Sequence, residues 1–331
     1  MIKNTLKKLF IKFSRILGYE IIDQNEFVSP TLSKELNQNL SEFNKKSIVL
    51  PLGEIKITRK VKKLLIVFRT NSKIEIWDQN KKRIFEADKI EYSKRCLISL
   101  IKSMKSLSSL RNDIKLKLLV IDNSLDTSDN NEFKNILNKS VIDYKIINHK
   151  NDEYKNKIQF DSNKETFGNL SSLLKCYETA KLKVKDLVYF VEDDYIHEEK
   201  CLVEMIETYE RLSSQLKREI FICPSDYPYL YTEIDQSKIF AGSNRHWRSI
   251  NKVLCTFLVS KEHLSKYWDN FNKTCLIRND PFEKHINEIF TKEICISPLK
   301  SLAVHITNIN SSYGLSPYIN YMKLWKENEN V

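Results

Sequence analysis

Four short apolar runs alternate with longer segments of helical periodicity over residues 63–191. The runs occupy residues 63–70, 116–121, 144–147 and 187–191, and helical spacing is found at 93–110, 133–137 and 167–182. Short strands that are apolar throughout and alternate with helices are typical of a parallel sheet covered on both faces. The pattern therefore predicts an α/β domain with a mixed, mainly parallel sheet flanked by helices.

The residues before and after this region follow other patterns. Residues 24–60 are polar and mixed, with Pro30, Pro51 and Gly53 as breakers, and are predicted to be a connecting segment. We expect an N-terminal extension and linker over 1–60, a main domain over 61–310 with halves 61–200 and 201–310, and a lid or tail over 311–331. Ser, Tyr and Gly within 308–317 suit a mobile lid.

Residues 1–18 have the pattern of a basic amphipathic helix. Five basic residues and no acid occur there, and apolar residues recur at helical spacing. Such a helix can lie on an anionic lipid surface; packing of its apolar side on the rest of the protein fits the pattern equally. Lysines interrupt the apolar stretch and no small-residue cleavage site follows, which disfavours a secretory signal. The basic residues are Lys3, Lys7, Lys8, Lys12 and Arg15.

Composition narrows the protein class further. No apolar segment approaches the roughly 20 residues that cross a bilayer, so we expect a protein that is soluble or peripheral on the inner face of the cell membrane. Seven cysteines are scattered singly, which indicates reduced core thiols. Scattered single cysteines are typical of a cytoplasmic protein. The net charge of +11 fits nucleic acid, a membrane or anionic substrates. Because positive charge gathers at the amino end and is not interleaved with stacking aromatics, no nucleic-acid partner is expected.

The apolar run at 187–191 ends in three consecutive acids, Glu192, Asp193 and Asp194. Adjacent like charges repel one another and resist burial, so a strand that brings them together commonly holds a cation. Mn²⁺ and Mg²⁺ prefer oxygen ligands, and substrate phosphates often complete their shells. Alternation along a strand puts Glu192 and Asp194 on one side. Alternatively, the acids cap a helix that begins near His197.

Polar residues also follow the other predicted strands. Arg69 and Thr70 end the first run, and Asp122 ends the second. Ligands of parallel sheets bind at the carboxyl ends of the strands, so these residues and the acids should converge on one crevice. Asp122 also suits an Asx turn with purely structural bonds. Neither G-x-G-x-x-G nor a P-loop motif occurs, so a bound pyrophosphate would need metal and side chains to neutralise it.

The order of these motifs resembles that of the GT-A fold nucleotide-sugar glycosyltransferases, in particular family 2-like enzymes. The matching segments are KLLIVFRT at Lys63–Thr70, LLVIDNS at 118–124, TFGNLSSLLKCYETA at 166–180 and LVYFVEDDY at 187–195. The resemblance covers about residues 62–310 and implies a Rossmann-like GT-A sheet, a nucleotide-diphosphate sugar donor, and Mn²⁺ or Mg²⁺. Two departures leave the donor nucleotide open: the acids begin with Glu192 rather than Asp, and the first strand ends in Arg-Thr.

By this resemblance Asp194 is the metal ligand, and His305, at the end of a late apolar run, completes the metal shell. Glu192 would lie near the ribose or a metal-bound water, and Asp122 near the nucleoside. A lone strand histidine also fits a purely structural role, and Gly168-Asn169 fits a helix start. The donor-binding candidates are Arg69, Thr70, Asp122, Asn169, Glu192, Asp193, Arg245 and Arg248.

The second half of the chain is expected to bind the acceptor. Tyr229 lies in an aromatic, proline-punctuated loop over 224–231, and Trp247 lies in the segment GSNRHWR at 242–248. Sugar rings stack on aromatic faces, and the guanidinium groups of Arg245 and Arg248 suit a phosphate of the donor or of a lipid-linked acceptor. A rigid surface turn and structural salt bridges are the alternatives.

Glycosyl transfer needs a base for the acceptor hydroxyl. In the resembling family it is often an acid placed before a late helix, and Asp280 occupies that place, with Glu283 as second choice. Asp280 is also predicted to be an N-cap, with Pro281 at the first helical position.

Together these features predict a metal-dependent glycosyltransferase that moves a sugar onto a glycan or lipid-linked acceptor, in surface polysaccharide biosynthesis. A nucleotidyltransferase on a similar sheet is the enzymatic alternative, although the Gly-rich segment usual after its first strand is missing. A non-catalytic basic membrane-binding module is the alternative from another class.

Overall fold

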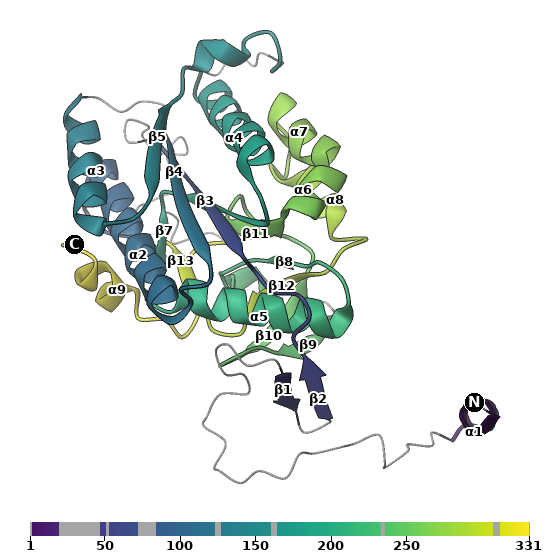
Figure 1. The fold of residues 1–331 in the computed structure, drawn as a ribbon. Coiled ribbons are helices and arrows are strands. Elements are labelled where there is room, and N and C mark those ends of the chain that lie inside the picture. Colours follow the sequence, from purple (N-terminus) through teal and green to yellow (C-terminus); the bar gives the residue numbers. More distant parts are fainter. Residues whose placement is uncertain are drawn as a thin grey trace.

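The computed structural model describes residues 2–19, 47–50, 53–71, 84–122, 127–159, 164–232, 236–306 and 312–330. A nine-stranded sheet forms the centre of the main body, in the order β5-β4-β3-β6-β11-β8-β12-β10-β9 (Figure 1). Its first four strands are mutually parallel. They are β5 (Tyr144–Asn148), β4 (Lys115–Asp122), β3 (Lys63–Thr70) and β6 (Leu187–Glu192).

Three helices connect these parallel strands: α2 (Lys89–Leu110), α3 (Thr127–Ser140) and α4 (Lys164–Lys183). The chain passes from β3 outward to β4 and β5 and then returns across the sheet to β6. Right-handed crossovers therefore put α2 and α3 on one face and α4 on the other. The predicted strands and helices of this half are confirmed, and the apolar runs of β3, β4 and β6 are buried in the sheet.

The second half of the sheet is mixed. β11 (Phe257–Ser260) pairs antiparallel with β6, and the remaining strands are β8 (Phe221–Ile222), β12 (Cys295–Pro298), β10 (His246–Ile250) and β9 (Ile239–Ala241). Of these, only β8 and β12 pair in parallel. The mixed α/β class is confirmed, with the parallel character concentrated in the first half. The helices here are α5 (Cys201–Leu216), α6 (Lys261–Lys266), α7 (Trp268–Leu276) and α8 (Lys284–Ile289).

A separate two-stranded antiparallel sheet pairs β7 (Tyr195–His197) with β13 (Ala303–His305). His305 lies directly opposite Tyr195 in this register. The expected helix near His197 instead begins at Cys201, because residues 195–197 form β7. The small sheet places the end of the late apolar run beside the residues that follow the acidic strand.

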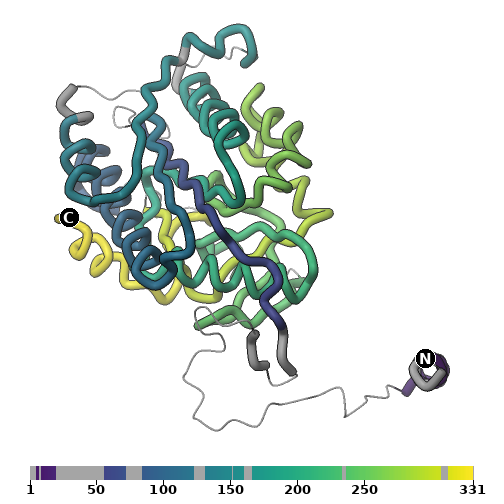
Figure 2. Tube along the Cα trace, viewed as in Figure 1, coloured from purple at the N-terminus to yellow at the C-terminus, as the bar shows by residue number. Residues whose placement is uncertain are grey.

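The last helix, α9 (Tyr321–Glu327), folds back beside α2, where the yellow end of the chain lies in Figure 2. Trp325 stacks on Phe85 with ring centroids 4.1 Å apart, and its carbonyl oxygen accepts a hydrogen bond from Arg95 at 2.6 Å. Within 312–330 the tail therefore packs on the main body. Residues 308–311 of the predicted lid lie outside the described residues.

Several local predictions need correction. The segment 24–60 was expected to be a linker, but β1 (Ser47–Leu50) and β2 (Gly53–Lys56) form an antiparallel pair within it; residues 20–46 lie outside the described part. Asp280 is not a helix cap, because α8 begins at Lys284 with Glu283 at the N-cap position. The segment GSNRHWR is a loop only in part, since β10 begins at His246.

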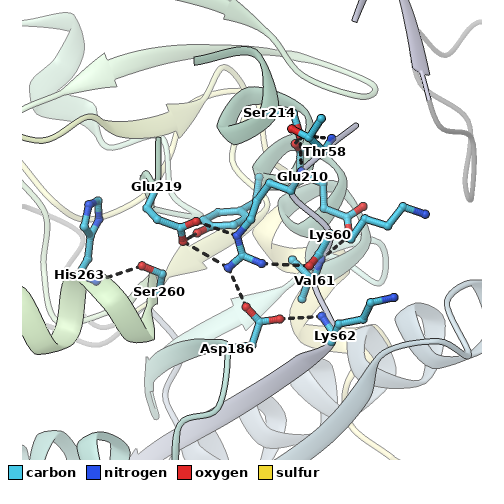
Figure 3. A network of polar contacts seen from close by, with 12 residues as sticks. Thr58, Lys60, Val61, Lys62, Asp186, Glu210, Ser214, Glu219, Ser260 and His263 are labelled. Atoms are coloured by element: carbon cyan, nitrogen blue, oxygen red, sulfur yellow. Dashed lines mark hydrogen bonds and ion pairs between the residues drawn. The ribbon is translucent and has the colours of Figure 1, made fainter. Parts of the chain in front are cut away.

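The amino ends of β3 and β6 are held by a polar network around Arg59 (Figure 3). The Arg59 guanidinium binds Asp186, just before β6, and Glu219, just before β8, each with a shortest distance of 2.7 Å. Asp186 also accepts the backbone N–H of Lys62 at 2.6 Å, and Glu210 of α5 accepts that of Val61 at 2.7 Å. The network holds the amino ends of these central strands in place, at the opposite end of the strands from their polar carboxyl ends.

The cysteines behave as predicted, since all seven are buried free thiols. In the described part of the chain, no helix is both long enough and apolar enough to span a membrane.

Candidate active site

A cavity of about 180 Å³ opens at the carboxyl ends of β3 and β6. Strand register creates it, because Arg69 pairs with Glu192 across the two strands, and Asp193 and Asp194 follow directly. Six of the predicted site residues line it: Arg69, Thr70, Asn169, Glu192, Asp193 and Asp194. The other lining residues are Asn71, Lys89, Thr166, Ser172, Arg278 and Phe282.

Arg69 is the centre of the first group of contacts in the cavity. Its guanidinium forms an ion pair with Glu192 and donates hydrogen bonds to the side-chain oxygen of Asn169 and to Ser172 Oγ, the latter at 3.2 Å. Burial alone would lower the pKa of Arg69, but the Glu192 carboxylate raises it, so the guanidinium stays charged. Arg69 thereby connects β3, β6 and α4 and sets the position of Glu192.

Asp193 is the centre of a second group of contacts. Whereas Arg69 donates hydrogen bonds, the Asp193 carboxylate accepts them from four donors. They are Thr70 Oγ1 at 2.8 Å, the Asn71 N–H at 3.1 Å, Lys89 Nζ at 2.6 Å and Ser93 Oγ at 2.6 Å. Burial would lower the pKa of Lys89, but the charge of Asp193 raises it. Asp193 therefore joins β6 to the end of β3 and the start of α2, and its carboxylate is occupied by protein donors.

Asp194 contacts His305, the residue that sequence analysis paired with it. Asp194 Oδ2 lies 3.0 Å from His305 Nε2, and His305 Nδ1 lies 2.9 Å from the carbonyl oxygen of Tyr313. A carbonyl oxygen can only accept, so Nδ1 carries a proton and Nε2 is directed at the carboxylate. The imidazole also stacks on Tyr195, with centroids 4.9 Å apart. Burial would lower the pKa of His305, but Asp194 raises it.

Glu192 and Glu283 form an acidic pair at the side of the cavity. Burial raises the pKa of Glu192, which the neighbouring Arg69 counteracts. Burial, and then the charge of Glu192, raise the pKa of Glu283 to about 7. Glu283 directly follows the lining residue Phe282 and accepts a contact from the Cys255 thiol at 3.7 Å. A carboxyl group with this pKa can accept a proton near neutral pH.

Asp280 and Asp122 lie outside the cavity lining. Asp280, the first-choice base, is exposed to solvent. Asp122 ends β4 beside Thr70, is buried, and its backbone carbonyl accepts the N–H of His149 at 2.7 Å. Residues 123–126, which follow it, lie outside the described part of the chain. The roles predicted for both aspartates stay predictions.

The expected acceptor aromatics are buried in the protein. Trp247 is fully buried, and its indole N–H donates to Glu204 of α5 at 3.3 Å. Tyr229 is also buried and donates its hydroxyl to the Lys252 carbonyl at 2.9 Å. Because neither ring presents a face to solvent, stacking of a sugar on them is not supported.

The two arginines of the same segment have structural partners. Arg245 binds the carbonyl of Lys300 at 2.7 Å and Glu198 at 3.2 Å. Arg248 forms an ion pair with the fully buried Asp226, and its guanidinium lies over the Tyr231 ring at 4.5 Å. These contacts match the structural alternative, and neither arginine lines the cavity.

Sequence analysis missed the cations Lys89 and Arg278 and the hydroxyl residues Ser93, Thr166 and Ser172. Ser172 follows Asn169 by three residues and Thr166 precedes it by three, so helical spacing alone could have linked them to Asn169. Lys89 and Ser93 lie on the first turns of α2, at the end of the segment after β3. No pattern in the chain pointed to Arg278.

The side chains at the cavity could supply some, but not all, of the ligands of a hard divalent cation. Among the described residues, no group of three or more His, Cys, Asp or Glu side chains is arranged to hold a metal ion. Asp194 and His305 would supply two ligands, which is enough where water and substrate phosphates supply the rest. The Nδ1–H bond to Tyr313 fixes the imidazole in the way that outer-shell contacts commonly orient metal ligands.

No protein-family model matches the chain, and no curated protein sequence does either. Several solved structures are similar in fold. Galactosyltransferase LgtC, in complex with donor and acceptor sugar analogs, is 10% identical, with 68% of this chain and 70% of that chain covered and a TM-score of 0.34. TarS of S. aureus is 10% identical; the match covers 73% of this chain and 36% of TarS, with a TM-score of 0.41. A UDP-glucose pyrophosphorylase complexed with UDP-glucose is 8% identical; the match covers 82% of this chain and 97% of the pyrophosphorylase, with a TM-score of 0.38. Similarity at this level does not identify an activity.

Proposed function

We propose that this protein is a metal-dependent glycosyltransferase that takes a sugar from a nucleotide-diphosphate donor to a glycan or lipid-linked acceptor. The observation that carries the proposal is the contact between Asp194 and His305 at 3.0 Å, beside the Arg69–Glu192 pair and the cavity. These residues come from the ends of β3, β6 and β13, where a parallel sheet binds its ligands. The motif order that resembles GT-A enzymes supports the same assignment.

In this proposal Asp194 and His305 hold Mn²⁺ or Mg²⁺, which when bound acts as a Lewis acid toward the donor pyrophosphate. Lys89 and Arg278 line the same cavity and add positive charge near the phosphates. Arg69 fixes Glu192 through their ion pair, which places the carboxylate at the sugar end of the donor. Thr166 and Asn169 offer polar atoms to the nucleoside or the sugar.

Glu283 is the proposed base. The acceptor hydroxyl oxygen forms the new bond to the anomeric carbon, the bond to the diphosphate oxygen breaks, and the nucleoside diphosphate leaves with that electron pair. Glu283 takes the hydroxyl proton, for which its pKa of about 7 is suited. Sugar transfer in surface polysaccharide biosynthesis remains the proposed setting.

The test is a panel of UDP-, GDP-, CMP- and dTDP-sugars, screened for thermal stabilisation with and without Mn²⁺. A bound donor at about 100 times its Kd should raise Tm by roughly 4–8 °C, because a ligand that binds the native state stabilises it. Asp194→Ala should remove the Mn²⁺-dependent part of the shift. Asp152→Ala, at an exposed position outside the cavity lining, is the matched control and should keep it.

Product analysis separates the two enzymatic alternatives. Glycosyl transfer releases a nucleoside diphosphate, whereas nucleotidyl transfer from a nucleoside triphosphate releases pyrophosphate. Retention of the full Mn²⁺-dependent shift by Asp194→Ala would overturn the metal assignment. Pyrophosphate release from a nucleoside triphosphate and a sugar phosphate would replace the proposed reaction with the alternative.

A further inference from the structure

The N-terminal helix carries an apolar face that is open to solvent. α1 (Ile2–Ile16) presents five apolar residues at helical spacing, and Leu17, directly after its end, continues the pattern; each of the six is between 58 and 75% exposed. With 100° of rotation per residue, they fall within an arc of about 120°. A contiguous exposed apolar surface of this kind marks an interaction site. The residues are Leu6, Leu9, Phe10, Phe13, Ile16 and Leu17.

α1 ends in a C-terminal cap at Gly18. Gly18 has φ +82°, in the left-handed region. Its N–H donates to the Arg15 carbonyl at 3.1 Å, and the N–H of Tyr19 donates to the Ser14 carbonyl at 2.9 Å. These two bonds form a Schellman cap, which satisfies the last carbonyls of the helix. The apolar face therefore belongs to a complete helix, and Figure 1 shows this helix apart from the main body.

Charge decides among the surfaces that could cover this face. Residues 1–18 contain five basic residues and no acid. A second copy would bring two such helices together, with five positive charges on each, and they would repel. An anionic lipid surface instead offers negative headgroups to the basic residues and acyl chains to the apolar arc. Lys12 and Arg15 fall outside the apolar arc, where headgroups would meet them.

We infer that α1 docks the protein on an anionic lipid bilayer, lying in the plane of the interface with Leu6, Leu9, Phe10, Phe13, Ile16 and Leu17 inserted. The inference is independent of the proposed function, because no residue of α1 lines the cavity. It would bring the catalytic domain to a membrane surface through α1 alone.

The experiment is flotation of the full-length chain with vesicles of phosphatidylcholine alone and of phosphatidylcholine with phosphatidylglycerol, at low and high salt. The wild type should float with the anionic vesicles only, and less at high salt. Two double variants separate the forces: Phe10→Gln with Phe13→Gln, and Lys12→Gln with Arg15→Gln. Glutamine keeps the helix propensity, so a loss reports insertion or charge rather than melting of α1.

Each double variant should reduce the affinity for anionic vesicles by about tenfold or more. The control, Leu182→Gln with Ile239→Gln, removes exposed apolar residues of the main body and should float like the wild type. Nucleotide-sugar stabilisation should be equal in all variants, so failure here is distinguishable from failure of the proposed function. Equal binding to neutral vesicles, absence of flotation, or a dimer in sedimentation that Phe10→Gln with Phe13→Gln dissolves would each overturn the inference.

Discussion

At the scale of single residues, the structure separates acids that hold the protein together from acids that are available for chemistry. Asp193 accepts four hydrogen bonds from protein donors, whereas Asp194 contacts a histidine at the cavity and Glu192 pairs with Arg69. Strand alternation already sets Asp193 apart from the other two acids, and the motif resemblance pairs Asp194 with His305. The partners of Glu192 and Asp193 come from distant segments, and no local pattern encodes those contacts.

We expect substitution of Glu283 to slow the transfer reaction strongly and substitution of Asp280 to leave its rate nearly unchanged. The pKa of Glu283 is raised to about 7, so its carboxylate form, and with it kcat/KM, should increase as the pH rises through about 7. Glu283→Gln should lower the transfer rate by about 10²–10⁴ and remove this limb of the pH profile. Asp280→Asn is the matched control and should change the rate by no more than a factor of about three, because its side chain is exposed and outside the cavity lining.

Donor binding, measured as thermal stabilisation, should survive in both variants. A transfer rate lost in Asp280→Asn and kept in Glu283→Gln would return the role of base to Asp280.

At the scale of elements, the sequence predicts the parallel half of the sheet well and the second half poorly. The runs that became β3, β4 and β6 carry consecutive buried residues, so they are apolar and stand out from their surroundings. β8, β9 and β10 have only two, three and five residues, so their apolar patterns are too short to stand out in the sequence. Trp247 was read as a ligand-binding aromatic because its partner Glu204 lies 43 residues away.

The candidate site follows the same division. Residues at the ends of the parallel strands were found because a sheet brings such ends together. Lys89 and Arg278 were missed because they come from segments outside the strand ends, whose approach to the cavity depends on tertiary packing. Arg245 and Arg248 were selected by residue type, and their structural partners, Glu198 and Asp226, lie in other segments.

The network in Figure 3 predicts that loss of the Arg59 side chain strongly lowers the free energy of unfolding. Arg59→Met leaves Asp186 and Glu219 without their shared cation, at side-chain exposures of only 14% each. The free energy of unfolding should fall by about 2–4 kcal/mol, because a partly buried carboxylate loses its partner. Urea unfolding monitored by circular dichroism measures it.

The control for this variant is Lys117→Met, which removes an ion pair to Asp143 at the surface, with exposures of 46 and 62%. Exposed pairs contribute about 0–1 kcal/mol, so the control should unfold close to the wild type. Equal loss in the two variants would mean that the Arg59 network does not hold the strands.

At the scale of the whole molecule, buried histidines should make stability depend on pH. Burial lowers the pKa of His149 to about 4 and that of His197 to about 3, from an ordinary value of 6.5. His197 lies beside the Tyr189 hydroxyl at 2.9 Å, and both are fully enclosed in the core. Between pH 6.5 and about 3 the unfolded chain binds protons that the folded protein does not.

The stability that these two histidines contribute should therefore fall as the pH drops below 6.5 and should not change above it. Urea midpoints at pH 8, 6, 5 and 4 measure the effect. His149→Gln should make the curve shallower, and His285→Gln, at a partly exposed position, serves as its control. A His149→Gln curve that runs parallel to that of the wild type between pH 6 and 4 would contradict the assignment of a buried neutral His149.

The small sheet of β7 and β13 joins side chains that are 111 positions apart. A ribosome makes the protein from its amino end, so the central strands and Asp194 emerge well before His305. β13, which is synthesised after all strands of the central sheet, thus completes the Asp194–His305 contact. A chain released early from translation would carry the parallel strands without the histidine that faces Asp194.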